Sequence, residues 1–94
     1  MKSACTILAR IEGHVQGVWY RAWTVEQAAA RGLRGWVRNR ADGSVEALFH
    51  GPAEHVADML RACHDGPPAA RVAAVRAEPV EEAPPAGFET RPTA

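Results

Sequence analysis

The sequence predicts an α+β domain in which one antiparallel sheet carries two helices on one face. Three observations lead to this fold class. Apolar residues alternate with polar ones in several segments of strand length, they recur at helical spacing in two other segments, and Asp42-Gly43 marks a hairpin. The resulting order is strand, helix, strand, strand, helix, strand and a short last strand. This is the split βαβ pattern of a ferredoxin-like sandwich.

The first strand and the first helix are expected at residues 6–12 and 22–31. The apolar side chains that share one face of this strand are Ile7, Ala9 and Ile11. Residues 22–31 contain no internal Gly or Pro, and Gly32 suits the end of a helix. The small and apolar residues at helical spacing in this segment are Val25, Ala28 and Ala29.

The hairpin joins a strand at residues 36–38 to one at residues 44–50. A second helix follows, with Pro52 in its first turn and Gly66 at its end. The apolar side chains at helical spacing in this helix are Val56, Met59, Leu60 and Cys63. Residues 71–80 and 88–91 are expected to be the last two strands.

Length and composition favour one ordinary globular domain spanning residues 1–94. The 11 basic residues balance the 11 acidic ones, so a nucleic-acid surface is not indicated. No apolar run reaches the roughly 18 residues of a membrane span, and the first apolar run is too short for a signal peptide. We therefore expect a cytoplasmic monomer with no membrane or nucleic-acid partner, in which Cys5 and Cys63 are reduced thiols.

The predicted strand order brings two distant residues to one edge of the sheet. The first and third strands are central antiparallel neighbours, and the second strand runs parallel to the first. Their C-terminal ends therefore lie on the same edge, about 10 Å apart by sheet spacing. The first strand leads to Arg21 and the second ends at Asn39, so these two residues are expected to flank one site.

The loop before the first helix has the composition of an anion site. Gly13 and Gly17 permit backbone conformations that are closed to other residues. The amides of residues 14–19 can turn inward just ahead of a helix N-terminus, which favours a bound anion. Arg21 adds a permanent charge and a planar donor fork suited to phosphate oxygens.

Simpler interpretations remain open for the same residues. A glycine-bearing turn before a helix is usually only a turn, an arginine at a helix start is usually solvated, and Asn39 suits a hairpin. The loop lacks the Gly-Lys-Ser/Thr ending of a Walker A motif and the spacing of a dinucleotide fingerprint. The histidines, which have no metal-ligand spacing, are His14, His50, His55 and His64.

Two long motifs resemble those of the acylphosphatase family. Residues 13–21, GHVQGVWYR, are similar to its first signature, Gly-x-Val-Gln-Gly-Val-x-Phe-Arg. Residues 35–51, GWVRNRADGSVEALFHG, are similar to its second signature. The resemblance extends to the Phe-x-x-Arg ending at residues 88–91 and so covers nearly the whole chain.

The resemblance implies an enzyme that hydrolyses the carboxyl-phosphate bond of acyl phosphates without a metal or an organic cofactor. By position, Arg21 and the preceding loop hold the phosphate group of the substrate, and Asn39 positions the attacking water. The same loop and arginine are expected to bind inorganic phosphate or a similar anion. The loop residues whose backbone amides take part are His14, Val15, Gln16, Gly17, Val18 and Trp19.

Four positions depart from the family pattern. Tyr20 adds a hydroxyl where Phe is usual, and Arg40 stands where a hydroxyl residue is common. Thr90 and Pro92 replace common residues at the end of the chain, which leaves the packing of the last strand open. The alternative functions are a non-catalytic phosphate- or partner-binding module of the same fold and an RNA-binding domain. The zero net charge counts against the RNA-binding domain.

Overall fold

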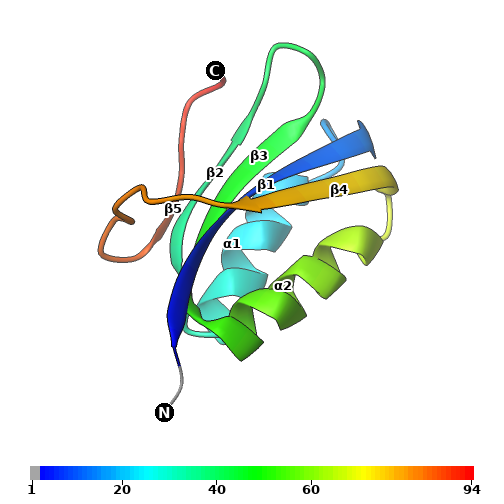
Figure 1. The fold of residues 1–94 in the computed structure, drawn as a ribbon. Coiled ribbons are helices and arrows are strands. Elements are labelled where there is room, and N and C mark those ends of the chain that lie inside the picture. Colours follow the sequence, from blue (N-terminus) through cyan, green and yellow to red (C-terminus); the bar gives the residue numbers. More distant parts are fainter. Residues whose placement is uncertain (1–2) are drawn as a thin grey trace.

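The computed structural model describes residues 3–94 and contains each of the predicted strands and helices (Figure 1). In chain order the elements are β1 (Ala4–His14), α1 (Tyr20–Ala30), β2 (Arg34–Asn39), β3 (Val45–Pro52), α2 (Ala53–Asp65), β4 (Arg71–Pro79) and β5 (Phe88–Thr90). Neither helix of the described chain has the length and apolar character of a membrane span.

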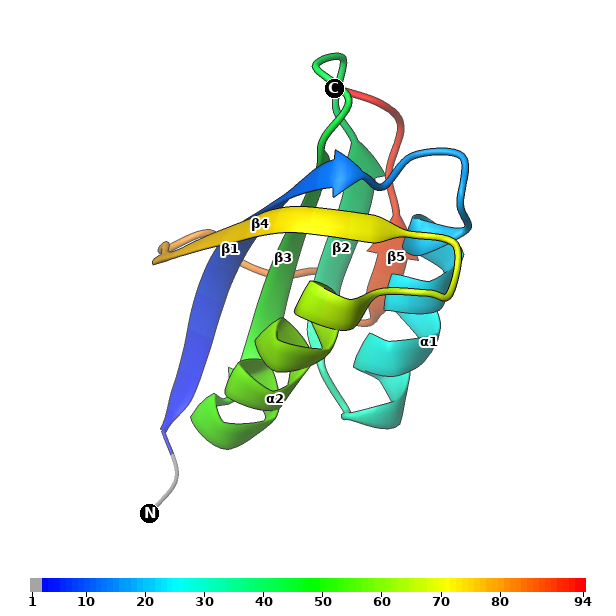
Figure 2. The same cartoon turned by 90° about the vertical axis from the view of Figure 1, so that its right-hand side faces the viewer.

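The strands form one sheet in the order β4-β1-β3-β2-β5. β1 and β3 are a central antiparallel pair, and β2 pairs with β3 through the hairpin, as the sequence predicts. The sheet is mixed rather than wholly antiparallel, because β5 runs parallel to β2 along residues 35–37. The loop after β4 carries the chain from one edge of the sheet to the other (Figure 2). β5 therefore enters beside Gly35, near the start of β2, and runs in the same direction.

Both helices pack on one face of the sheet, and the core lies between the two layers (Figure 1). The buried residues of α2 are Val56, Met59 and Cys63, which belong to the predicted stripe. The buried residues of α1 are Tyr20, Thr24 and Ala28. α1 begins at Tyr20, before the expected residue 22. Its buried residues recur every four positions; of the predicted set, Ala28 is buried, Val25 packs partly against the core and Ala29 is exposed.

The helix-free face of the sheet is partly covered by the loop between β4 and β5 (Figure 1). Trp36 of β2 is 2% exposed, and its Nε1 donates a 2.9 Å hydrogen bond to the carboxylate of Glu82 in this loop. The guanidinium carbons of Arg38 and Arg91 lie 4.7 and 5.1 Å from the centroid of the Trp36 ring. These contacts explain how an indole outside the main core is buried.

Candidate active site

The C-terminal ends of β1 and β2 lie at the same edge of the sheet, with β3 between them (Figure 2). β1 leads into the loop at residues 15–19, and β2 ends at Asn39. A cavity of about 470 Å³ opens at this edge. Its lining residues are Val15, Gly17, Trp19, Tyr20, Arg21, Ala22, Asn39 and Thr90. Arg21 and Asn39 therefore line one cavity, at the place where the strand order predicts that they meet.

Two residues of the loop have left-handed backbone conformations. Gly17 has a φ of 73°, which glycine adopts without strain. Trp19 has a φ of 68° and is the N-cap of α1, although its side chain makes no capping hydrogen bond. Because a residue with a bulky side chain rarely adopts this conformation, the path of the loop holds Trp19 there against its local preference.

The backbone N–H groups of this loop are not used by the rest of the fold. Among the loop and turn hydrogen bonds of residues 3–94, none is donated by the amides of Val15, Gln16, Gly17, Val18 or Trp19. The hydrogen bond from the Trp23 amide to the Trp19 carbonyl, of 3.0 Å, begins the ladder of α1. Unused amides ahead of a helix N-terminus are suitable donors for an anion.

Arg21 stands on the first turn of α1, and no carboxylate in residues 3–94 forms an ion pair with it. Arg31 and Arg38, by contrast, are paired: Arg31 contacts Asp58 at 2.8 Å and Arg38 contacts Glu46 at 2.7 Å. The positive charge of Arg21 thus lies beside the loop amides without a protein anion to balance it. This arrangement favours an anionic ligand.

Asn39 is held in place from the side of the last strand. Its backbone carbonyl accepts a 3.0 Å hydrogen bond from the amide of Ala94, so the segment after β5 continues alongside β2. The ring of Phe88 stacks on that of Phe49 with 5.6 Å between centroids. The departures at Thr90 and Pro92 therefore do not prevent this strand from packing, and Thr90 becomes part of the cavity lining.

Gln16 braces the loop against the hairpin. Its Nε2 donates hydrogen bonds to the backbone carbonyls of Arg40 and Ser44, both at 2.8 Å. Gln16, the exposed His14 and the buried Val18 do not line the cavity. The expectation for these three residues concerns their backbone amides, and it remains a prediction. The bracing role of Gln16 carries no signal in the sequence, because both of its partners are main-chain carbonyls.

Tyr20, the departure inside the first motif, has a buried partner. Its hydroxyl donates a 2.7 Å hydrogen bond to the backbone carbonyl of Cys63 on α2. Burial raises the pKa of this hydroxyl above its ordinary value of 10.0, so it remains protonated and donates. The ring centroid of Trp23 lies 5.2 Å from that of Tyr20. The extra hydroxyl thus joins the two helices beside the cavity.

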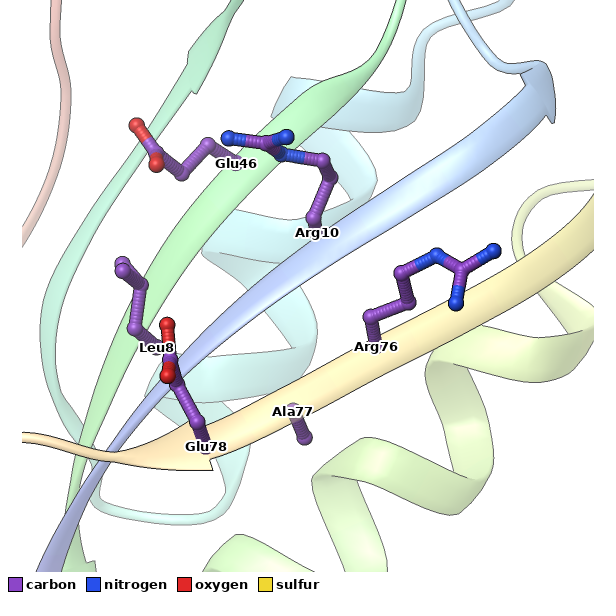
Figure 3. Close-up of a pocket in the computed structure, with 6 residues that line it drawn as sticks. All are labelled: Leu8, Arg10, Glu46, Arg76, Ala77 and Glu78. Atoms are coloured by element: carbon purple, nitrogen blue, oxygen red, sulfur yellow. The ribbon is translucent and has the colours of Figure 1, made fainter.

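A second cavity, of about 340 Å³, lies on the helix-free face of the sheet (Figure 3). Its lining residues are Leu8, Arg10, Glu46, Arg76, Ala77 and Glu78. Glu46 accepts a 2.8 Å hydrogen bond from Arg38 and pairs with Arg40 at 3.3 Å, and Arg76 pairs with Glu12 at 3.3 Å. Arg76 is thus neutralised within the fold. Arg10 forms no ion pair within residues 3–94, but it shares the lining with Glu46 and Glu78, and these two carboxylates would repel a phosphate group. The second cavity therefore does not match the predicted site.

The side chains of the first cavity can bind and orient an anion. They include one cation, Arg21, and one carboxamide, Asn39, and none is Asp, Glu, His or Cys. The lining thus supplies charge and hydrogen bonds rather than a side-chain base. Within residues 3–94, no group of three or more His, Cys, Asp or Glu side chains is arranged to hold a metal ion.

Comparisons in sequence and in structure point to one family. The family model described as Acylphosphatase matches residues 7–90. A protein of Rhodospirillum rubrum named Acylphosphatase is 60% identical over 88 residues, which are 94% of this chain and 97% of that protein. The solved structure of an acylphosphatase from Coxiella burnetii has a TM-score of 0.90 at 30% identity, covering 94% of this chain and 93% of that one. Full-length HypF in its phosphate- and nucleotide-bound form has a TM-score of 0.89 at 21% identity, which shows the fold alone; the match covers 99% of this chain and 12% of that one.

Proposed function

The chain belongs to the acylphosphatase family, which comprises enzymes that act on small acyl phosphates, and we propose that the cavity lined by Arg21 and Asn39 is its active site. There it hydrolyses an acyl phosphate to a carboxylate and inorganic phosphate. One observation carries this proposal: an arginine without a carboxylate partner and an asparagine line the same cavity beside a row of unused backbone amides.

In this proposal the phosphate group is bound by the backbone of residues 14–19 and by Arg21. The amides surround the phosphate oxygens, and the guanidinium group of Arg21 balances their negative charge. The positive end of the α1 dipole adds to the attraction, because the loop ends at the N-terminus of this helix. Gln16 keeps the loop in place relative to Asn39 through its two hydrogen bonds to the hairpin.

The Asn39 carboxamide positions a water molecule, which attacks the phosphorus atom opposite the acyl oxygen. The bond between phosphorus and the acyl oxygen breaks, and the carboxylate leaves with the electron pair. A phosphate oxygen takes the proton of the attacking water, which agrees with the absence of Asp, Glu and His from the lining residues. Because a carboxylate is a stable leaving group, binding and orientation supply most of the rate enhancement.

Phosphate release from acetyl phosphate and benzoyl phosphate, measured for the wild type and for single variants, tests the proposal. Arg21→Ala is expected to lower kcat/KM by about 100-fold or more, because it removes a donor that stabilises the developing charge. Asn39→Ala is expected to lower kcat more than it raises KM, because Asn39 acts on the water rather than on the phosphate group. Arg10→Ala is the matched control, since it removes an arginine from the helix-free face of the sheet.

Binding of inorganic phosphate separates the enzyme from the alternative function. Phosphate should raise the Tm of the wild type and of Asn39→Ala, and it should not raise that of Arg21→Ala. A protein that binds phosphate but hydrolyses none of several acyl phosphates would be the non-catalytic phosphate-binding module. If Arg21→Ala turned over substrate at the wild-type rate, the reaction would take place outside this cavity.

We further propose that the enzyme acts as a cytoplasmic monomer. The support for a monomer is that Arg21 and Asn39 of the same chain line the cavity, so the proposed reaction needs no residue of a second copy. Size-exclusion chromatography with light scattering tests the oligomeric state, and a dimer at assay concentration would contradict it. Fractionation of the source cells tests the compartment.

A further inference from the structure

We propose that the indole of Trp19 binds the organic part of the substrate, so that the enzyme favours acyl phosphates with an aromatic or large apolar acyl group. The inference rests on the active site proposed above, in which the phosphate group lies between the loop amides and Arg21. Trp19 is close to Arg21 in the chain, and both residues line the same cavity. An acyl group attached to the bound phosphate therefore lies near the indole.

The exposure of Trp19 sets it apart from the other large apolar residues of the described chain. Trp19 is 82% exposed, whereas Tyr20 and Trp36 are each 2% exposed. Within residues 3–94 the ring of Trp19 forms no aromatic pair and no cation–π contact, because those contacts involve other rings. A large exposed apolar side chain beside a cavity is typical of a ligand-binding surface rather than of core packing.

The backbone of Trp19 also favours a functional role for the side chain. Its φ of 68° is a conformation that glycine adopts freely and that a bulky residue adopts against a steric penalty. The conformation turns the chain from the loop into α1, for which no side chain is needed. Strained positions of this kind concentrate at ligand-binding sites. An indole at such a position, with no aromatic or cation–π partner in residues 3–94, is explained by contact with a ligand.

The rest of the lining suits an apolar acyl group. Beyond Arg21 and Asn39, which the proposed mechanism already uses, and Gly17, which has no side chain, the exposed part of the wall comes from Trp19, Ala22 and Thr90. None of these three side chains carries a charge that could bind a carboxylate or an amine on the acyl group. A phenyl ring can stack on the indole face, whereas the methyl group of acetyl phosphate is too small to cover it.

Steady-state kinetics with benzoyl phosphate and acetyl phosphate test the inference through the ratio of the two kcat/KM values. Trp19→Gly removes the ring and relieves the positive φ, so loss of the fold is not expected to confuse the result. The benzoyl-to-acetyl ratio should fall about tenfold in Trp19→Gly and in Trp19→Ala, mainly through KM, because the lost contact is made in the ground state and the transition state alike. Trp19→Phe keeps an aromatic face and should retain most of the preference.

Acrylamide quenching of tryptophan fluorescence gives a readout that needs no turnover. Trp19 is exposed, Trp23 is half-buried and Trp36 is buried, so this neutral quencher reports mainly on Trp19. Benzylphosphonate, which resembles benzoyl phosphate but cannot be hydrolysed, should protect the fluorescence from quenching. Methylphosphonate, which has the same charged group, should bind without protecting it. Trp19→Phe should abolish the difference between the two ligands.

Two results would overturn the inference: an unchanged benzoyl-to-acetyl ratio in Trp19→Gly, or equal protection by the two phosphonates. Either would leave the indole as a surface for another protein rather than for the substrate. Failure of the proposed active site has a different signature. In that case the wild type would hydrolyse neither acyl phosphate, and Arg21→Ala would bind methylphosphonate as tightly as the wild type does.

Discussion

The hydroxyl of Tyr20 donates a 2.7 Å hydrogen bond to the backbone carbonyl of Cys63, which joins the start of α1 to the last turns of α2. Both residues are buried, at 2% and 0% exposure. Tyr20 is also the residue before Arg21, so this contact between the helices lies next to the proposed phosphate-binding arginine. A residue that departs from the usual pattern of the motif thus contributes to the packing of α1 on α2.

Tyr20→Phe is expected to lower the free energy of unfolding by about 1–2 kcal/mol, because the buried Cys63 carbonyl loses this donor. The ring remains, so kcat with acetyl phosphate should stay within about twofold of the wild type. Urea denaturation measures the stability. Thr24→Val is the comparison variant: Thr24 donates to the Tyr20 carbonyl, which also accepts the helical hydrogen bond, so its effect should be smaller. Equal losses in the two variants would contradict this account.

Alkaline pH is expected to destabilise the fold through the buried side chains of Tyr20 and Cys63. Burial raises the pKa of the Cys63 thiol from 9.0 to about 11 and raises the pKa of the Tyr20 hydroxyl as well. Between pH 9 and 11 the unfolded thiol therefore releases its proton while the folded thiol keeps it. The unfolded state then binds fewer protons, so the free energy of unfolding falls as pH rises.

Denaturation midpoints at pH 8, 9, 10 and 11 measure this dependence. The buried thiol accounts for about 2 kcal/mol at the upper end of the range, by the free-energy equivalent of its pKa shift. Cys63→Ala lacks the thiol and should show a shallower decline than the wild type, even though the variant starts from a lower stability. Parallel pH profiles for the two proteins would show that the thiol does not contribute.

Gly17→Ala and Gly43→Ala form a matched pair that separates conformational strain from function. Both glycines have positive φ, 73° and 93°, and a Cβ added at either position meets nothing within 4 Å. Each substitution should therefore lower stability by a similar amount, about 1 kcal/mol. Only Gly17 lines the proposed active site, so only Gly17→Ala should raise KM for acetyl phosphate, by about tenfold. A similar KM change in Gly43→Ala would mean that the effect comes from general destabilisation.

Much of the fold could be predicted from local patterns. Alternation, helical spacing and the Asp42-Gly43 turn gave the elements, and a small set of topological rules then placed Arg21 and Asn39 at one edge of the sheet. The parallel pairing of β5 with β2 was not predictable in this way. It depends on how the loop after β4 crosses the sheet, and the contact between Trp36 and Glu82 in that loop is a long-range one.

The hydrogen-bond partners of the side chains around the site could not be predicted from the sequence either. Tyr20 and Gln16 both donate to backbone carbonyls of residues far along the chain, and a carbonyl is the same in every residue type. Trp19 gave no signal of its conformation, because a positive φ is marked in sequences mainly by glycine. Sequence patterns therefore placed Arg21 and Asn39 at the site, whereas the hydrogen bonds that hold the surrounding loop and helices were found only in the structure.

The two hydrogen bonds of Gln16 also restrict how this protein can vary. Turns at the tips of hairpins commonly tolerate insertions, because they are exposed and few contacts depend on them. Here one amide nitrogen contacts the carbonyls of Arg40 and Ser44, which stand on the two sides of the tip at residues 41–43. An added residue would carry one of these carbonyls out of reach. The length of this tip is thus fixed from outside the hairpin, in addition to the limit that the positive φ of Gly43 places on its sequence.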